Sequence, residues 1–181
     1  MAITLGPLDL VVVDSLETAL HTHFGWSRFR SGQRPVVEAV LSGRDALAVL
    51  PTGGGKSLCY QLPALIRGGL VVVISPLVAL MEDQVLQLQR RGIAAACLHA
   101  GLDPARRQQA MVALRDTSLR LLYLAPERLQ GEATQRMLET HAAEGRLVAL
   151  AVDEAHCISA WGHDFRPDYR RLGLIRRLCP G

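Results

Sequence analysis

Lysine is almost absent from this sequence of 181 residues. Of its 20 basic residues, only Lys56 is a lysine, and all the others are arginines. Arginine carries a broad planar fork of donors, whereas lysine carries a compact ammonium on a slim stem. The single lysine stands directly after three consecutive glycines. This placement predicts a specific role for its ammonium.

Aromatic residues and long apolar runs are also scarce. The chain has three Phe, two Trp and three Tyr, while 49% of its residues are hydrophobic, which predicts an aliphatic α/β protein. No apolar run approaches the length of a membrane span. The N-terminus lacks the basic region and the long apolar core of a signal peptide. We therefore expect a cytoplasmic protein with no membrane partner.

Paired cysteines and strong charge are missing as well. The four cysteines, Cys59, Cys97, Cys157 and Cys179, form no C-x-x-C pair. The spacing therefore predicts neither a zinc site nor a redox motif, and buried free thiols are expected. The net charge of +3 lies wholly in residues 161–181, which hold five arginines and two aspartates. This segment suggests a polyanionic partner, although solvated arginines at a helix end are the alternative.

Short apolar runs alternate with helical stretches along most of the chain. Strands are expected over Ala46–Leu50, Leu70–Ser75, Ala94–Leu98, Leu119–Leu124 and Leu147–Val152. Helices are expected over 56–67, 77–91, 104–115 and 132–144. Strands that are apolar on both faces are typical of buried parallel sheets. The repeated βαβ order predicts an α/β fold, with a parallel sheet covered by helices on both faces.

Two further helices are expected before this alternation. Asp14 and Glu17 predict an N-cap with its capping-box partner, opening a helix that reaches Phe24. A second helix is expected over 34–41. The predicted organisation is an N-terminal extension over 1–14, a helical region over 15–44 and an α/β domain over 45–181.

A glycine-rich loop follows the first expected strand. It consists of Thr52, Gly53, Gly54, Gly55, Lys56 and Ser57. A loop between a strand and a helix is the setting that phosphate binding requires, because its N–H groups can surround a phosphate. The Lys56 ammonium can reach the β- and γ-phosphates, and the Ser57 hydroxyl can ligate Mg²⁺. Leu50 stands where the strict G-x-x-x-x-G-K-[ST] pattern has glycine, and a tight turn is the alternative interpretation.

Two acids follow the last expected strand. Asp153 and Glu154 come directly after Leu147–Val152, and ligands bind at the carboxyl edge of a parallel sheet. Asp153 suits a Mg²⁺ ligand, and Glu154 suits a base that orients the attacking water. Capping of the next helix is the alternative, but the phosphate loop favours the catalytic interpretation.

Two segments combine the scarce aromatics with polar residues. In segment 24–33, the Gln33 amide can bond an adenine edge and an aromatic ring can stack on the base. The alternative is a helix–loop–helix with two core phenylalanines. In segment 161–167, aromatic rings lie beside arginine, as single-strand binding needs. The alternative is a loop that folds onto its own aromatic anchors.

Together, these residues resemble the RecQ helicases of superfamily 2. The matching segments are 24–33 (motif 0), 51–61 (motif I), 74–84 (motif Ia), 123–129 (between Ia and II) and 153–167 (motif II and the aromatic-rich loop). That family's motif I accounts for the missing first glycine. The last segment separates RecQ from other DEAH-bearing helicases. Motif 0 and the aromatic-rich loop together disfavour an RNA-directed helicase.

The resemblance implies a first RecA-like P-loop NTPase lobe that uses ATP and Mg²⁺. The implied catalytic residues are Lys56, Asp153, Glu154 and His156, the last relaying nucleotide state. The implied cofactor-binding residues are Trp26, Arg30, Gln33, Thr52, Gly53, Gly54, Gly55, Lys56 and Ser57. The implied Mg²⁺ ligands are Ser57 and Asp153. The implied DNA contacts are Ser75, Pro76, Trp161, His163, Phe165 and Arg166.

The implied activity is ATP-dependent DNA unwinding with 3′-to-5′ polarity, in DNA repair or recombination. ATP hydrolysis would drive translocation on single-stranded DNA, with duplex junctions and a second RecA-like lobe as partners. The chain stops at Gly181, before that family's motif III and the arginine finger of its second lobe. We therefore expect the chain to be C-terminally incomplete and not a competent motor alone. The alternative is a nucleotide- or DNA-binding module without helicase turnover.

Overall fold

The structure is a computed structural model that describes residues 12–51, 53–155 and 177. The chain divides into two compact units, unit 1 within residues 1–67 and unit 2 within residues 68–180. None of the described helices is long and apolar enough to cross a bilayer. The predicted site residues outside the described ranges are Thr52, His156, Trp161, His163, Phe165 and Arg166.

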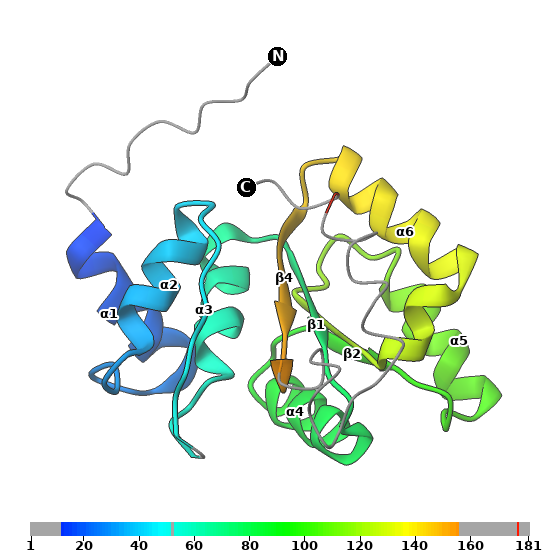
Figure 1. Cartoon of the computed structure of the whole chain (residues 1–181), viewed down its shortest axis with the longest axis horizontal. Coiled ribbons are helices and arrows are strands. Elements are labelled where there is room, and N and C mark those ends of the chain that lie inside the picture. The colour runs from blue at the N-terminus through cyan, green and yellow to red at the C-terminus, as the bar shows by residue number, and fades with distance from the viewer. Residues whose placement is uncertain (1–11, 52, 156–176, 178–181) are drawn as a thin grey trace. The chain divides into compact units, whose positions relative to one another are not determined.

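The described part of unit 1 contains three helices (Figure 1). They are α1 (Val12–Phe24), α2 (Gln33–Leu41) and α3 (Leu58–Arg67). Helix α3 packs against both α1 and α2. Leu16 and Leu20 of α1, spaced one turn apart, are buried, as are Val37 of α2 and Leu62 of α3. The apolar stripes of these amphipathic helices therefore form the core of unit 1.

Two predictions for unit 1 are wrong. Helix α1 already includes Val12, so Asp14 lies inside the helix and is not its N-cap. Residues 46–50 form no strand, and the side chains of Leu47 and Val49 are 83% and 86% exposed. An apolar run becomes a strand only when its backbone bonds a neighbouring strand. None of the described strands pairs with this run.

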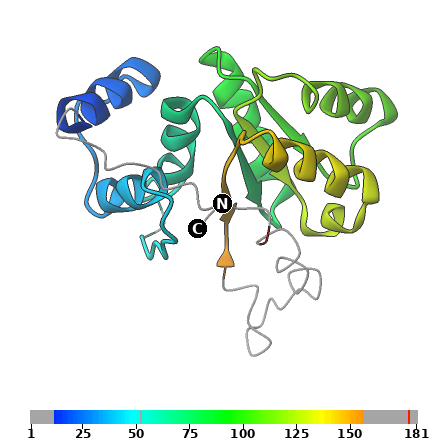
Figure 2. The same cartoon turned by 90° about the horizontal axis from the view of Figure 1, so that it is seen from above.

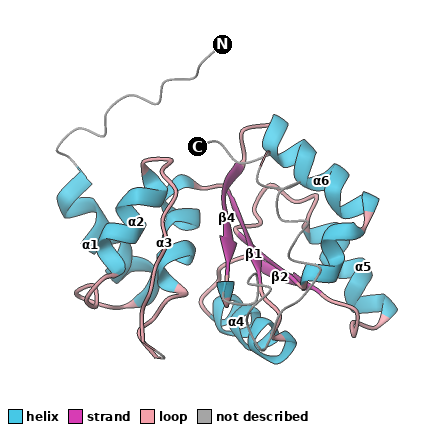
Figure 3. Ribbon diagram, viewed as in Figure 1, coloured by secondary structure: helices cyan, strands magenta, loops and turns pink. Residues whose placement is uncertain are grey.

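Unit 2 is built on a parallel sheet with strand order β2-β3-β1-β4. The strands are β1 (Leu70–Ile74), β2 (Ala95–Leu98), β3 (Leu121–Leu124) and β4 (Leu147–Val152). The helices are α4 (Val78–Arg90), α5 (Pro104–Ala113), α6 (Glu132–Ala143) and the short 3₁₀ helix η1 (Pro126–Gln130). Figure 3 distinguishes these elements by colour. The predicted α/β class with a parallel sheet is confirmed.

Helices cover both faces of this sheet. Successive strand residues point to opposite faces, and Val72 and Ile74 join one cluster with residues of α5 and α6. Val71 and Val73, on the other face, are also fully buried. Along the strand order, the connection from β1 through α4 to β2 runs in one direction. The connections from β2 to β3 and from β3 to β4 run in the opposite direction. Right-handed crossovers therefore place α4 on one face and α5 and α6 together on the other (Figure 2).

The carboxyl ends of the strands form a single edge. Ser75, Ala125 and Asp153 each follow a strand, and each donates its N–H to a carbonyl of the neighbouring strand at 2.8–3.1 Å. The backbone ladder therefore continues one residue past the strands. The residues that emerge at this edge are held by the sheet itself.

Candidate functional site

The glycine loop of unit 1 adopts a conformation that needs glycine. Gly53 and Gly55 have φ of +76° and +75°, in the left-handed region where side chains are strained. Gly54 donates its N–H to the Pro51 carbonyl at 2.9 Å, and a Cβ on Gly54 would lie 2.8 Å from the same oxygen. All three glycines are therefore required by the backbone of the turn.

Arg30 and Gln33 hold this loop by its carbonyl groups. Arg30 Nη1 donates to Gly53 O at 2.5 Å, and Gln33 Nε2 donates to Gly54 O at 3.2 Å and to Gly55 O at 3.0 Å. Gln33 Oε1 accepts from Arg30 N at 2.7 Å, and Gln33 is only 1% exposed. The residues predicted to bind adenine thus contact the loop, and their contact with adenine stays a prediction.

The amide groups of the loop are available for a ligand. The N–H groups of Lys56 and Ser57 have no acceptor among the described residues. The C=O and N–H of one peptide point in opposite directions, so the bond from Gln33 to Gly55 O turns the Lys56 N–H away from Gln33. These amides immediately precede α3, whose positive dipole end favours an anion. The arrangement fits a phosphate group.

Lys56 itself is positioned for the same ligand. It is half-buried, and within the described part of the chain its ammonium forms no ion pair. A half-buried cation beside two N–H groups that have no acceptor among the described residues is complementary to a charged phosphate oxygen. The predicted phosphate-binding group and the available amides thus come from adjacent residues.

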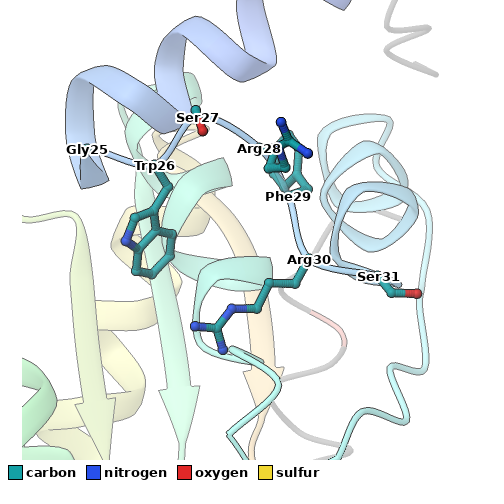
Figure 4. Close-up of a pocket in the computed structure, with 7 residues that line it drawn as sticks. All are labelled: Gly25, Trp26, Ser27, Arg28, Phe29, Arg30 and Ser31. Carbon is teal, nitrogen blue, oxygen red and sulfur yellow. The ribbon is translucent and has the colours of Figure 1, made fainter.

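A hollow of about 640 Å³ lies along residues 25–31 of unit 1. The Trp26 ring, 42% exposed, stacks on Phe24 with ring centroids 5.5 Å apart and an interplanar angle of 24°. Figure 4 shows Trp26 and the Arg30 guanidinium extending to the same side of the loop. An exposed aromatic surface beside a guanidinium fits a planar base.

The two predicted acids of unit 2 follow β4 at the carboxyl edge of its sheet. Asp153 Oδ1 accepts from Glu154 N at 3.0 Å. Among the described residues, Glu154 is the one non-glycine residue with a positive φ, of 49°. Such backbone strain costs on the order of 1–3 kcal/mol and is concentrated at functional sites. The structure therefore holds Glu154 in a conformation that its own backbone disfavours.

Two of the predicted DNA contacts, Ser75 and Pro76, lie in the described residues, and neither is fully exposed. Ser75 is 2% exposed, and its hydroxyl accepts from Leu77 N at 3.4 Å, directly before α4. Pro76 is half-buried. The Ser75 hydroxyl therefore serves the backbone here, and both DNA contacts stay predictions.

The sequence patterns missed a polar cluster at the carboxyl edge of the sheet. His99 follows β2 and is 3% exposed, and its Nε2 lies 3.4 Å from Glu82 Oε1. Glu82 Oε1 also lies 3.5 Å from Arg106 Nη1, and Arg128 Nη2 donates to His99 O at 2.8 Å. The one available signal was a carboxylate at position 82, inside the motif Ia segment. Its partners lie on other elements and could not be identified from spacing.

Cys59 is a buried free thiol, as expected, whereas Cys97 is a free thiol that is only half-buried. Burial raises the pKa of the Cys59 thiol to about 11 and also raises the pKa of Cys97. Both are therefore poor nucleophiles near neutral pH. Within the described ranges, no three His, Cys, Asp or Glu side chains gather to hold a metal ion.

Comparison with known proteins identifies relatives of the chain. Residues 30–180 match the DEAD/DEAH box helicase family. The chain is 50% identical over 163 residues to ATP-dependent DNA helicase RecQ of Synechocystis sp., covering 90% of the chain and 34% of the relative. It is 46% identical over 163 residues to probable ATP-dependent DNA helicase RecS of Bacillus subtilis, and the match covers 90% of the chain and 32% of that relative. It is 45% identical over 163 residues to ATP-dependent DNA helicase RecQ of Haemophilus influenzae, and the match covers 90% of the chain and 26% of that relative. The chain thus spans about a third or less of these curated relatives.

Proposed function

The chain belongs to the DEAD/DEAH box helicase family, and we propose that it is the first ATP-binding lobe of a RecQ-type DNA helicase. The proposed activity couples ATP hydrolysis to 3′-to-5′ translocation on single-stranded DNA and to duplex unwinding in the cytoplasm. Its partners are DNA and a second RecA-like lobe. The observation that carries the proposal is the glycine loop, where Lys56 and two N–H groups without a described acceptor precede α3.

ATP binding divides between two parts of unit 1. The Lys56 ammonium and the loop amides bind the phosphates, while the exposed Trp26 ring stacks on adenine. Both ends of the Gln33 amide already have partners, so its contact with adenine requires it to exchange some of those bonds. Base binding and loop geometry are therefore linked through one side chain.

Hydrolysis depends on the acids of unit 2. Bound Mg²⁺–ATP supplies the phosphoryl group. Asp153 is proposed as a Mg²⁺ ligand, with Ser57 as the other protein ligand. Glu154 orients the attacking water and accepts its proton. The strained backbone at Glu154 supports this role, because strain is retained where a side chain must be aimed.

The experiment that tests nucleotide binding is Lys56→Ala in this chain. Affinity for ATP–Mg²⁺ should fall about tenfold to a hundredfold, since a hydrogen bond to a charged group contributes ~1.5–3 kcal/mol. Calorimetric titration measures the affinity. The melting temperature should change little, because Lys56 has no described ion pair. Arg136→Ala, which removes an exposed positive charge on α6, is the control. Unchanged ATP affinity in Lys56→Ala would show that the phosphate-loop assignment is wrong.

Hydrolysis is tested by Glu154→Gln in a protein of the relatives' full length that contains this chain. The amide keeps the size of the side chain but cannot accept a proton from water. ATP affinity should therefore persist while turnover is lost. Near-normal turnover would remove Glu154 from its role. ATP binding without turnover in the parent protein would favour a nucleotide-binding module.

A further inference from the structure

Arg34 forms a bridge between the helices of unit 1. It follows Gln33 in the first turn of α2, and its side chain is 31% exposed. Its Nε donates to Glu38 Oε1 at 2.8 Å, and its Nη1 donates to Glu17 Oε1 of α1. Hydrogen bonding to Glu38, the largest effect, raises the pKa of Arg34 above its ordinary value despite partial burial. The guanidinium is therefore charged and held from two helices.

The same guanidinium covers an aromatic ring of the loop over residues 25–31. Arg34 Cζ lies 6.0 Å from the centroid of the Phe29 ring, within the range of a cation–π contact. Phe29 is half-buried and lines the hollow together with Trp26 and Arg30. The two carboxylates thus bond a guanidinium whose Cζ lies over a ring that lines this hollow.

Ring contacts are what hold the central part of this loop. Residues 26–29 form no hydrogen bond with another described residue. Trp26 stacks on Phe24 at one end, and Phe29 lies under Arg34 at the other. If either contact were removed, no hydrogen bond from another described residue would hold residues 26–29. The loop that presents the Trp26 ring thus has a described ring contact at each end.

We propose that Arg34 is a positioning residue for the base of the bound nucleotide. Clamped by Glu17 and Glu38, it fixes Phe29 and thereby the part of the loop that presents Trp26, while Arg30 is held separately by its bonds to Gln33 and Gly53. This inference rests on the proposed function, because it takes adenine as the occupant of the hollow. It extends that function by separating base binding, which depends on Arg34, from phosphate binding, which depends on Lys56.

The test compares two ligands that share phosphates and differ in the base. ATP–Mg²⁺ and inorganic tripolyphosphate–Mg²⁺ are titrated calorimetrically into this chain and its Arg34→Met variant. Methionine keeps an unbranched stem at position 34 and removes the charged fork. We expect ATP affinity to fall about five- to tenfold, ~1–1.4 kcal/mol at 1.4 kcal/mol per tenfold. Tripolyphosphate affinity should stay the same.

Three further variants sharpen this test. Arg34→Lys should recover part of the ATP affinity, because a point charge cannot reproduce the planar fork. Phe29→Leu should lower the affinity for ATP but not the affinity for tripolyphosphate. Combining Phe29→Leu with Arg34→Met should lower ATP affinity no further than the single variants do. Glu17→Gln keeps the Arg34 side chain but removes one of its two carboxylate partners, so it should lower the affinity for ATP by less than Arg34→Met does and leave that for tripolyphosphate unchanged.

Arg136→Met is the matched control. Arg136 also pairs with an acid one helical turn away, Glu132, at 3.2 Å, and it lies in unit 2. Its loss should change neither affinity. The inference is overturned if Arg34→Met and Glu17→Gln bind ATP as the parent does, or if ATP and tripolyphosphate weaken equally. A parent chain that binds neither ligand overturns the proposed function, and the inference with it.

Discussion

At the scale of single residues, the candidate phosphate site depends on backbone geometry as much as on Lys56. Gly55 and Gly43 both have positive φ, of +75° and +70°. A Cβ on Gly55 would lie 2.4 Å from Gln33 Nε2, whereas a Cβ on Gly43 would meet nothing within 4 Å. The two glycines therefore separate the cost of a strained backbone from the cost of displacing Gln33.

We predict different outcomes for alanine at these two positions. Gly43→Ala should lower the free energy of unfolding by about 1 kcal/mol through strain alone and leave ATP affinity unchanged. Gly55→Ala should also displace the Gln33 side chain. It should lower the affinities for ATP and for tripolyphosphate by at least about tenfold each. Urea unfolding and calorimetric titration measure the two effects. Equal ATP affinity in both variants would contradict a role for the Gln33 contact.

The sequence allowed the key residue of the loop to be identified, but not the contacts that hold the loop. The rarity of lysine singled out Lys56, because composition is visible without a fold. The bonds from Gln33 to the loop join residues 21 and 22 positions apart. Such contacts follow from how α2 and α3 pack, which no local pattern specifies.

At the scale of elements, buried strands were predictable and isolated ones were not. The runs that became β1 to β4 are apolar on both faces and lie between helices that cover them. In β4 the pairing with β1 shifts register between Leu147 and Ala149. This bulge lets Leu147 and Leu150 contribute to the same cluster. Strict alternation would have placed those two side chains on opposite faces.

The turn between α5 and β3 provides a prediction about pH. Asp116 Oδ1 accepts from Ser118 N at 2.8 Å, and this bond lowers the pKa of Asp116 below its ordinary value of 3.8. The ionised carboxylate therefore stabilises the fold above the ordinary pKa. That contribution is lost as pH falls through the lowered pKa of the folded state.

Replacing Asp116 with asparagine should remove this pH-dependent contribution. The parent should be more stable than Asp116→Asn at about pH 7, and the difference should shrink by about pH 3. Urea unfolding at both pH values measures the difference. Glu139→Gln, on the exposed surface of α6, controls for the loss of one charge. A difference that grows on acidification would contradict the direction of the Asp116 pKa shift.

At the scale of the whole molecule, the chain supplies about a third or less of the length of its relatives. DNA-stimulated hydrolysis is therefore a proposal for a longer protein. The segment 161–167 begins only a few residues after Glu154, so DNA bound there would lie near the proposed catalytic acids along the chain. The segment lies outside the described residues, and its role stays a prediction.

We predict that Phe165→Ala and Arg166→Ala in a protein of the relatives' length uncouple DNA from hydrolysis. Stacking of one base on an aromatic ring contributes ~1–3 kcal/mol, so stimulation of the ATPase by single-stranded DNA should fall far more than ATP affinity. Arg166→Ala should also make DNA binding less dependent on salt if it contacts phosphate. ATPase rates with and without DNA, beside ATP affinity, measure the effect. Full stimulation in both variants would show that this segment serves structure only.

The fold class of the protein could be predicted from its amino-acid sequence alone. Strands apolar on both faces specify a covered parallel sheet, and the motifs carry the helicase resemblance in order along the chain. The glycine loop and the acids after β4 could also be identified from the sequence, because each is a contiguous segment whose chemistry depends on neighbouring residues.

The tertiary structure, in contrast, determines which side chains and backbone groups come into contact. It left residues 46–50 without a described partner strand, because strand formation needs a second backbone. It put Gln33 on the loop carbonyls and Arg34 over Phe29, contacts that depend on how helices pack. It also set Glu154 in a left-handed conformation, which a chain adopts only when its surroundings outweigh the local cost.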